Sequence, residues 1–573
     1  MGEAQAICGH ILARAPEHVQ SLNLLGLVVQ TSGDHRTAVK MFAKALAVDQ
    51  LNTACHYNIG NSYQALGRRD EALAHFRKAL AFGMGGGAVV NFILESPVIA
   101  SCLARIADKW PLPVKGDELY GSKGLAPLAE DLFLRCAMAS MTLESVALEM
   151  LLTNARAKVL RIAGGQETDA READAEIVAF ACALAQQCFI NEYIYVQAAE
   201  EIELAASVRD RLLHNLVAGD AIPPLALAAV AAFFPLHTLP GAEALLRREW
   251  PAVADPLLQQ QLREPFEEAG ERTAITALTP VRDRTSLQVM RQYEESPYPR
   301  WTINPLAAFV VDRTQGKTIP KAEANDELDI LIAGCGTGLH AVQVAQVYPK
   351  ARLLAVDMSV TSLAYARRKT RELGLCNIEY AQADILELAS IGRTFDRVES
   401  VGVLHHLAHP TTGWRVLLEM LRPGGQMRVG LYSETARGVI VEARARIAAR
   451  GYQATAQDIR KCRQDIVREA DGGRWKALIG SRDFYSMSGC RDLLFNVMEH
   501  RFTIAEIAAF LDQNDLSFLG FEFFDDRSVI EKFQQRFPDP AAMTNIEYWR
   551  AFEADNPQTF WGMYLFLLRK SAS

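Results

Sequence analysis

The sequence lacks the cysteine patterns of secreted or metal-dependent proteins. Its ten cysteines contain no C-x-x-C pair, and none stands at a spacing to histidine that suits a metal site. Scattered cysteines of this kind are typical of reduced thiols in a cytosolic protein. We therefore expect no metal site and a cytoplasmic location. The ten are Cys8, Cys55, Cys102, Cys136, Cys182, Cys188, Cys335, Cys376, Cys462 and Cys490.

Long apolar runs and an excess of basic residues are missing as well. The longest apolar run, Ile222 to Leu236, is interrupted by three prolines and is too short to cross a bilayer. No basic segment followed by an apolar core opens the chain, so no secretory leader is expected. The formal net charge of −8 argues against a broad nucleic-acid surface. We expect neither a membrane nor a nucleic acid as a partner.

The composition that remains is ordinary. Half of the 573 residues are apolar and 22% are charged, as in soluble globular proteins. The length predicts three or four domains, each with room for a buried core.

An internal repeat occupies residues 1–83. Four residues recur 34 positions later in the same order: Gly26, Ala38, Phe42 and Ala45 return as Gly60, Ala72, Phe76 and Ala79. This period, with small residues where two helices touch and Phe between them, resembles the tetratricopeptide repeat. About two and a half repeats are visible, and three are usually needed for stability, so they should lean on the next domain.

Stacked helix pairs of this kind present a concave surface suited to peptides or partner helices. We expect polar side chains such as His56 and Asn58 on the solvent side, where they can hydrogen-bond a peptide. An inert scaffold or a dimer contact is the alternative use of the repeats.

Residues 84–275 are rich in Ala, Leu and Glu at helical spacing and contain no chemical motif. This stretch predicts an all-helical middle domain that acts as a spacer. Gln186, Gln187, Asn191 and Glu192 are candidate site residues there, but solvated or capped polar groups are the favoured interpretation.

The most informative stretch begins at Leu328, where a short aliphatic run breaks into Gly334-Cys335-Gly336-Thr337-Gly338. Helical periodicity follows from Ala341 to Tyr348, so the segment predicts a strand, a tight turn and a helix. Glycines let the backbone turn and approach a ligand closely. The G-x-G-x-G spacing differs from the G-x-G-x-x-G of an NAD site.

The sequence after the glycine turn narrows the choice of ligand. A second strand, 352–356, ends at Asp357, where a carboxylate can take both hydroxyls of a ribose. Asp384 closes a third strand, 378–382, where a carboxylate can accept an adenine amino group. A fourth strand, 395–401, runs into Gly402 and the histidines His405 and His406. The sequence LRPGG at 421–425 predicts a turn before a fifth strand, 426–431.

In this order and spacing the landmarks resemble class I S-adenosylmethionine-dependent methyltransferases. The resemblance implies an α/β fold: a Rossmann-like domain over 319–573, preceded by the all-α repeats and the α-helical middle domain. It also implies a mainly parallel sheet of six or seven strands with one antiparallel strand, whose last two strands are Phe518 to Phe524 and Phe560 to Phe566. S-adenosylmethionine is then the cofactor, bound by Gly334, Cys335, Gly336, Gly338, Asp357, Met358, Asp384, Ile385, Val401 and Gly402.

The segment before this domain, 276–318, packs three aromatics around two prolines, which favour a rigid extended chain. In class I methyltransferases such a segment often folds over the cofactor as a lid, so Tyr293, Tyr298 and Trp301 are expected to line the acceptor channel. Packing against the helical domain is the alternative. Tyr432 and, from a helical insertion at about 436–500, Tyr485 are further aromatic candidates.

His405 or His406 can serve as a proton acceptor or can merely shape the pocket. The candidate catalytic residues are therefore Tyr293, Tyr298, Trp301, His405 and Tyr432. The Pro-Pro-aromatic motif of many base and amide N-methylating enzymes is absent after the fourth strand.

The layout resembles bacterial methyltransferases with tetratricopeptide repeats and, less specifically, bacterial protein lysine methyltransferases. This implies methyl transfer to a protein amine, a protein or peptide partner and a homodimer. Two alternatives stay open: a small-molecule methyltransferase that uses its repeats for assembly, and a scaffold protein with a vestigial cofactor domain.

Overall fold

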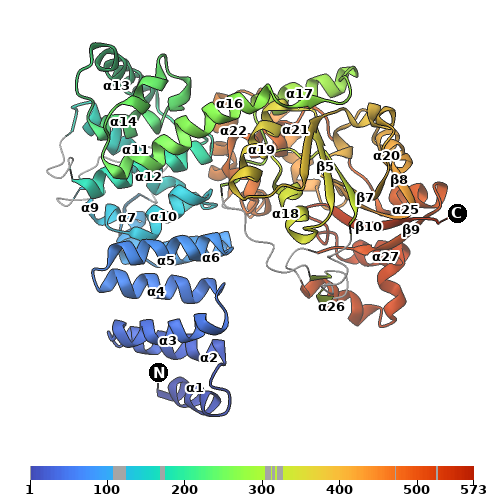
Figure 1. Ribbon diagram of the computed structural model, residues 1–573, viewed down its shortest axis with the longest axis horizontal. Helices are drawn as coiled ribbons and strands as arrows, with labels where there is room; N and C mark the ends of the chain where they lie inside the picture. The colour runs from blue at the N-terminus through green and yellow to red at the C-terminus, as the bar shows by residue number, and fades with distance from the viewer. Residues whose placement is uncertain are drawn as a thin grey trace.

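The computed structural model describes residues 2–106, 124–167, 174–302, 311–312, 317–318, 327–470, 473–523 and 527–572. Figure 1 shows a stack of helices that leads from the N-terminus into a helical domain, with an α/β domain beside it. The domain boundary predicted at 319 lies outside the described residues, as does Phe524, the predicted end of the sixth strand.

The stack contains two complete helix pairs. Its helices are α1 (Gly2–Arg14), α2 (Val19–Thr31), α3 (His35–Val48), α4 (Thr53–Ala65) and α5 (Arg69–Ala81). A Cβ at Gly26 would lie 2.5 Å from the Phe42 ring, and Gly60 lies against Phe76 in the same way. The predicted seam of small residues and Phe is confirmed.

His56 and Asn58 are not on the solvent side of the stack, so that expectation was wrong. His56 and Asn58 are 4% and 6% exposed. The Asn58 amide donates to Asn23 Oδ1 at 3.0 Å, and Gln30 donates to the Asn58 carbonyl oxygen at 2.8 Å. These side chains join neighbouring helices because α2 packs directly against α4.

The last repeat shares a core with the middle domain, as its small number of repeats predicted. The rings of Phe76 and Phe133 are 5.1 Å apart, and Tyr57 stacks on Phe92 at 4.1 Å. The middle domain consists of α6 (Gly86–Leu94), α7 (Pro97–Ile106), α9 (Ala126–Ala129), α10 (Leu132–Ser140), α11 (Val146–Ala163), α12 (Ala175–Ile190), α13 (Ala199–Ala218), α14 (Pro224–Ala231), η2 (Leu236–Thr238), η3 (Ala242–Arg247), η4 (Ala252–Ala254), α15 (Asp255–Leu258), η5 (Gln259–Arg263) and α16 (Glu264–Arg272).

Helix α12 runs through the core of this domain. Gln187 and Asn191 are fully buried and Gln186 is nearly so, which contradicts solvation of these groups, whereas Asn191 does cap the end of α12. No single helix in the described part of the chain is long and apolar enough to cross a membrane; α6 and α7, bent by 83°, pass that test only as a pair.

The α/β domain is built on an eight-stranded sheet in the order β1-β6-β5-β4-β7-β8-β10-β9, in which β10 alone runs antiparallel to its neighbours. Its strands are β1 (Thr276–Ala277), β4 (Asp329–Ala333), β5 (Arg352–Asp357), β6 (Ile378–Gln382), β7 (Phe395–Val401), β8 (Leu421–Leu431), β9 (Leu516–Phe521) and β10 (Tyr564–Lys570). A separate pair joins β2 (Val311–Asp312) to β3 (Lys317–Thr318).

The sheet differs from its prediction at four places. The additional strand is β1, which pairs with β6 and is too short to show an alternating pattern. The predicted turn at 421–425 is part of β8, because the pairing with β7 shifts between Phe395 and Arg397 and accommodates the extra residues as a bulge. The strand predicted at 518–524 is β9, which spans Leu516–Phe521, and the last strand begins at Tyr564 and not at Phe560.

Helices cover both faces of the sheet. Ile330 and Ile332 of β4 pack toward α18 (Leu339–Val347) and α19 (Val360–Glu372), whereas Leu331 and Ala333 face the opposite core. That opposite core includes α20 (Pro410–Glu419), α25 (Ile504–Gln513) and α27 (Ile546–Asp555). Further elements of this domain are α17 (Arg284–Glu295), η7 (Ile385–Ile391), η8 (Leu404–His406), α26 (Arg527–Arg536) and η11 (Pro540–Thr544).

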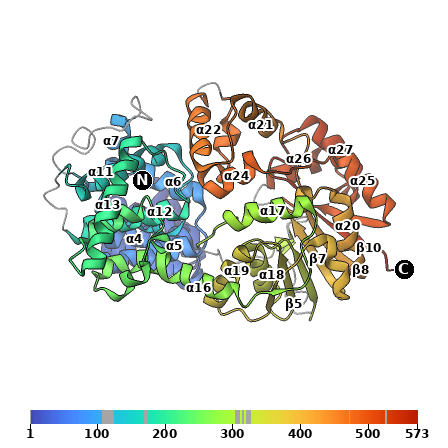
Figure 2. The same cartoon turned by 90° about the horizontal axis from the view of Figure 1, so that it is seen from above.

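An insertion after β8 contains α21 (Gly438–Arg450), α22 (Ala456–Arg468), α23 (Lys476–Ile479), η10 (Arg482–Tyr485) and α24 (Met487–Phe495). Figure 2 shows α22 and α24 on the side of the α/β domain that faces the middle domain. The Arg463 guanidinium forms two hydrogen bonds, 2.8 and 3.0 Å, to the Glu149 carboxylate, and both side chains are buried. The middle domain therefore shares a core with the insertion, and its interpretation as a spacer was wrong.

Candidate active site

A cavity of about 380 Å³ lies at the carboxyl ends of β4, β5, β6 and β7. Ligands of open parallel sheets bind at this edge, next to the strand at which the chain changes direction across the sheet. Here β5 and β6 lie on one side of β4, and β7 and β8 lie on the other. One half of the cavity is formed by the strand ends, and the other by α17, the residues after β8 and the insertion.

The turn after β4 and the end of β5 are joined by Asp357. Its Oδ2 accepts from the Gly336 amide at 2.8 Å, and its Oδ1 accepts from the Ser359 amide at 2.9 Å. Burial raises the pKa of Asp357, and these amides oppose the rise. A carboxylate has about four acceptor positions, so Asp357 retains capacity for ribose hydroxyls in the cavity.

Asp384 follows β6 and is 1% exposed. Its Oδ1 accepts from the Leu386 amide at 3.0 Å, and its own amide donates to Thr279. Within the described chain, Asp384 Oδ2 is buried and accepts no hydrogen bond of good geometry, and the Ser286 hydroxyl lies near the carboxylate. Burial raises its pKa. A buried acceptor without a partner at this edge fits the adenine amino group of S-adenosylmethionine.

Nine of the ten predicted cofactor residues line the cavity, and Gly338 does not. A Cβ at Gly338 would lie 2.6 Å from Ala366 Cβ and 3.0 Å from the Tyr380 hydroxyl. Its place is therefore in the packing of the turn against α19. The other nine are Gly334, Cys335, Gly336, Asp357, Met358, Asp384, Ile385, Val401 and Gly402.

The segment after α17 lies directly on the glycine turn. A Cβ at Gly336 would come within 2.7 Å of the Tyr298 carbonyl oxygen. The Thr337 hydroxyl donates to the Pro299 carbonyl oxygen, and the Trp301 indole N–H donates to the Thr337 carbonyl oxygen at 3.0 Å. Trp301 is 3% exposed and packs behind the turn against Tyr365, so its expected place in the channel was wrong.

Tyrosines and aspartates meet in the second half of the cavity. The Tyr293 hydroxyl donates to Asp492 Oδ1, and the Tyr298 hydroxyl donates to Asp483 Oδ1, both at 2.6 Å. Asp492 is 4% exposed, and the Asn496 amide also donates to it at 2.8 Å. Burial raises the pKa of Asp483, and the nearby Asp492 adds to the rise.

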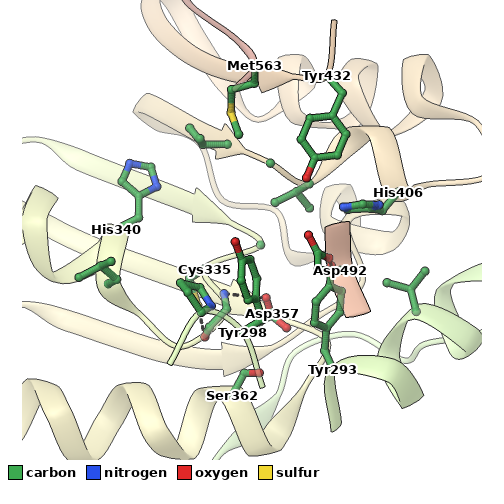
Figure 3. Close-up of a pocket in the computed structure, with 18 of the residues that line it drawn as sticks. Tyr293, Tyr298, Cys335, His340, Asp357, Ser362, His406, Tyr432, Asp492 and Met563 are labelled. Carbon is green, nitrogen blue, oxygen red and sulfur yellow. Dashed lines mark hydrogen bonds between the residues drawn. The ribbon is translucent and has the colours of Figure 1, made fainter. Parts of the chain in front are cut away.

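Tyr432 closes this half from the opposite side. Its ring lies between His405, stacked at 3.7 Å, and the Arg437 guanidinium, 3.6 Å from the ring centre. Arg437 is also paired with Glu499 at 2.9 Å. Figure 3 shows the Tyr432 hydroxyl pointing into the cavity across from Tyr298 and Tyr293.

His405 does not reach the cavity, which corrects its place among the catalytic candidates. It is fully buried behind Tyr432, and neither ring nitrogen has a hydrogen-bond partner among the described residues. Burial lowers the pKa of His405, and His406 and Arg437 lower it further. His406 lines the cavity and hydrogen-bonds the Met498 carbonyl oxygen at 2.6 Å.

Asp483, Asp492 and Arg437 come from the insertion or its start and were not among the predicted site residues. Tyr485, an expected aromatic residue of the pocket, is instead buried in the core shared with the middle domain. The sequence signal that could have indicated Asp483 is a carboxylate next to aromatic residues. In the described chain no three His, Cys, Asp or Glu side chains are grouped as metal ligands.

Two family models match the chain. Residues 330–425 match the methyltransferase domain, and residues 53–82 match the tetratricopeptide repeat. Residues 330–425 thus form a methyltransferase domain.

Curated relatives share part of the chain. An uncharacterized protein of Synechococcus sp. is 30% identical over 181 residues, which cover 29% of this chain and 42% of that protein. A ubiquinone biosynthesis O-methyltransferase of Methylocella silvestris is 35% identical over 108 residues, which cover 19% of this chain and 41% of that protein. A trans-aconitate 2-methyltransferase of Deinococcus radiodurans is 40% identical over 97 residues, which cover 17% of this chain and 34% of that protein. The chain thus spans less than half the length of these relatives.

Among solved structures, PKMT2 of Rickettsia typhi in complex with AdoHcy is 18% identical with a TM-score of 0.33. The match covers 43% of this chain and 49% of that one.

Proposed function

We propose that the protein is an N-methyltransferase whose acceptor is an amine on a polypeptide, with a lysine side chain as the best fit. The observation that carries the proposal is the pair of tyrosine-bound carboxylates, Asp483 and Asp492, in the cavity. Arg437, the arginine among the described lining residues, is paired with Glu499. An anionic and aromatic half-cavity attracts an ammonium or methylated ammonium group.

When bound, S-adenosylmethionine supplies a methyl group on a sulfonium for in-line displacement. The protein has to align the amine lone pair with that methyl group and exclude water. Tyr293, Tyr298 and Tyr432 surround the amine and desolvate it, which lowers the pKa of an ammonium. The Asp483 carboxylate, with its raised pKa, receives the proton that the amine gives up.

The repeats and the middle domain then hold the polypeptide acceptor. Stacked repeats suit protein contacts in general, and assembly into a homodimer is the alternative use. All ten cysteines are free and nine are buried, which supports a cytoplasmic location.

A small-molecule acceptor is the second candidate, favoured by the similarity to relatives named for ubiquinone biosynthesis and trans-aconitate. Under that function the purified protein consumes cofactor with a metabolite extract stripped of macromolecules. Under the first function it transfers labelled methyl to a polypeptide band.

The first test is calorimetric titration of S-adenosylmethionine into the wild-type protein and Asp357→Ala, followed by labelled-methyl transfer to whole-cell protein. Binding that Asp357→Ala abolishes, together with a labelled band, supports the proposal. No binding would leave a scaffold with a vestigial cofactor domain. Deletion of 1–51 retains α4 and α5, which cover the middle-domain core, and should abolish the band if the repeats recruit the acceptor.

A further inference from the structure

A turn of the middle domain supports the acceptor half of the cavity from behind. Asn191, Glu192 and Tyr193 follow α12, and Glu192 and Tyr193 have φ angles of +57° and +60°. Two consecutive non-glycine residues in this left-handed region are sterically disfavoured, so other contacts must hold them. The middle domain alone does not supply all of those contacts.

The first set of contacts comes from the insertion. The Met487 amide donates to the Asn191 carbonyl oxygen at 3.2 Å, and the Ser488 amide donates to Glu192 Oε2. Arg460 donates twice to the Tyr193 carbonyl oxygen, at 2.9 and 2.7 Å. The Glu192 carboxylate thus satisfies an amide in the first turn of α24, where negative charge is favourable.

That turn is close to the acceptor residues. Asp492 lies four residues after Ser488, one helical turn further along the same face of α24. Asp483 lies in η10, which directly precedes α24. A shift of the start of α24 would therefore move both carboxylates relative to the tyrosines that bind them.

The second contact of Glu192 reaches the segment after α17. Its Oε1 lies 3.6 Å from Arg300 Nε, and Arg300 comes two residues after Tyr298. Burial raises the pKa of Glu192, and Arg300 opposes that rise. One carboxylate of the middle domain therefore contacts both walls of the acceptor half.

We propose that Glu192 is a positioning residue, which holds the Tyr298 segment and the Asp492 helix at the separation that an acceptor amine requires. This inference rests on the proposed function. Asn191, Glu192 and Tyr193 are not among the described residues that line the cavity, so Glu192 acts through its neighbours and sets the fit of the acceptor, not that of the cofactor.

Hydrogen–deuterium exchange of the full chain, saturated with S-adenosylhomocysteine, tests the bracing directly. The variants are Glu192→Ala, Glu192→Gln and the control Glu176→Gln, which changes an ion-paired middle-domain carboxylate at the repeat junction. In Glu192→Ala, α24 and residues 296–301 should exchange at least about tenfold faster than in wild type. Glu192→Gln should fall between, because its amide oxygen can still accept from Ser488, and Glu176→Gln should match wild type. Unchanged exchange in Glu192→Ala would overturn the inference.

Kinetics separate positioning from general loss of structure. With Nα-acetyl-lysine methylamide as acceptor, Glu192→Ala should raise KM about fivefold or more and leave the Kd of S-adenosylhomocysteine unchanged, with partial recovery in Glu192→Gln. An equal loss of cofactor affinity would show a structural role only and contradict the inference. If the wild-type enzyme does not turn over this minimal acceptor, the same comparison is made with the polypeptide that it labels in whole-cell protein. Absence of any labelled polypeptide would contradict the amine acceptor, and the exchange data would then decide the bracing alone.

Discussion

The Tyr298 hydroxyl donates to Asp483 Oδ1 over 2.6 Å, across 185 residues of sequence. Tyr293 makes the equivalent bond to Asp492 across 199 residues. Both bonds join the segment between β1 and β4 to the insertion after β8. The acceptor half of the cavity is therefore complete only when these two segments have docked on each other.

The first prediction concerns Asp483→Asn, which keeps the shape of the side chain and removes its charge. The KM for a lysine acceptor should rise about 10- to 100-fold, as expected for a lost charge-assisted interaction of about 1.5–3 kcal/mol. Calorimetry should give an unchanged Kd for S-adenosylmethionine, because the Asp483 side chain bonds Tyr298 and not one of the expected cofactor residues. Asp555→Asn, at an exposed ion pair, is the control and should change neither value. Equal KM values for Asp483→Asn and wild type would refute an anionic acceptor site.

The second prediction separates backbone strain from close approach at the glycine turn. Gly336 has φ +52° and would place a Cβ 2.7 Å from the Tyr298 carbonyl oxygen; Gly374 has φ +67° and would meet nothing within 4 Å. Substitution of either glycine by Ala should lower the free energy of unfolding by about 1 kcal/mol, because Ala is strained at a positive φ. Only Gly336→Ala should also displace Tyr298 and weaken S-adenosylhomocysteine binding, measured by calorimetry. Equal affinities of the two variants would argue against the close approach.

The cofactor half of the site could be predicted because its residues follow strands directly. Asp357 and Asp384 are placed by the ends of β5 and β6, which short apolar runs reveal locally. The acceptor half depends on how an insertion docks, and nothing in the local sequence of Asp492 encodes its bond to Tyr293. The same limit explains the error at Trp301, whose aromatic character suits a channel and a buried core equally.

The fold, like the site, could be predicted where local sequence patterns determine it and could not where packing between distant segments does. The 34-residue period and the strand patterns predicted the repeats and most of the sheet. The middle domain was misinterpreted because burial of Gln187 and Asn191 depends on the helices that surround α12. Polar side chains carry no local mark that distinguishes a buried position from a solvated one.

The third prediction tests the core shared by the middle domain and the insertion. Arg463→Met leaves the buried Glu149 carboxylate without its partner and should destabilise the protein by about 3–5 kcal/mol. Thermal unfolding should show a clear drop in Tm, and the double variant Arg463→Met, Glu149→Leu should recover much of it. Arg68→Met removes the exposed pair with Glu71 and should shift Tm little. A small effect of Arg463→Met would mean that the two domains are not one cooperative unit.

The fourth prediction decides which group takes the proton. His405 is buried with a lowered pKa, so it is neutral and remote from the acceptor. His405→Phe keeps the ring that stacks on Tyr432, and turnover should stay within about twofold of wild type with an unchanged pH profile. Asp483 has a raised pKa, and its protonated form cannot accept a proton. The wild-type rate should therefore fall as the pH decreases through that pKa, in addition to the titration of the amine, and Asp483→Asn should remove this dependence. Rates measured across pH with a lysine acceptor check both variants. If the fall in rate at low pH were lost in His405→Phe but kept in Asp483→Asn, the proton acceptor would be the histidine. Tyr432 would then have to rearrange so that His405 is exposed to the cavity.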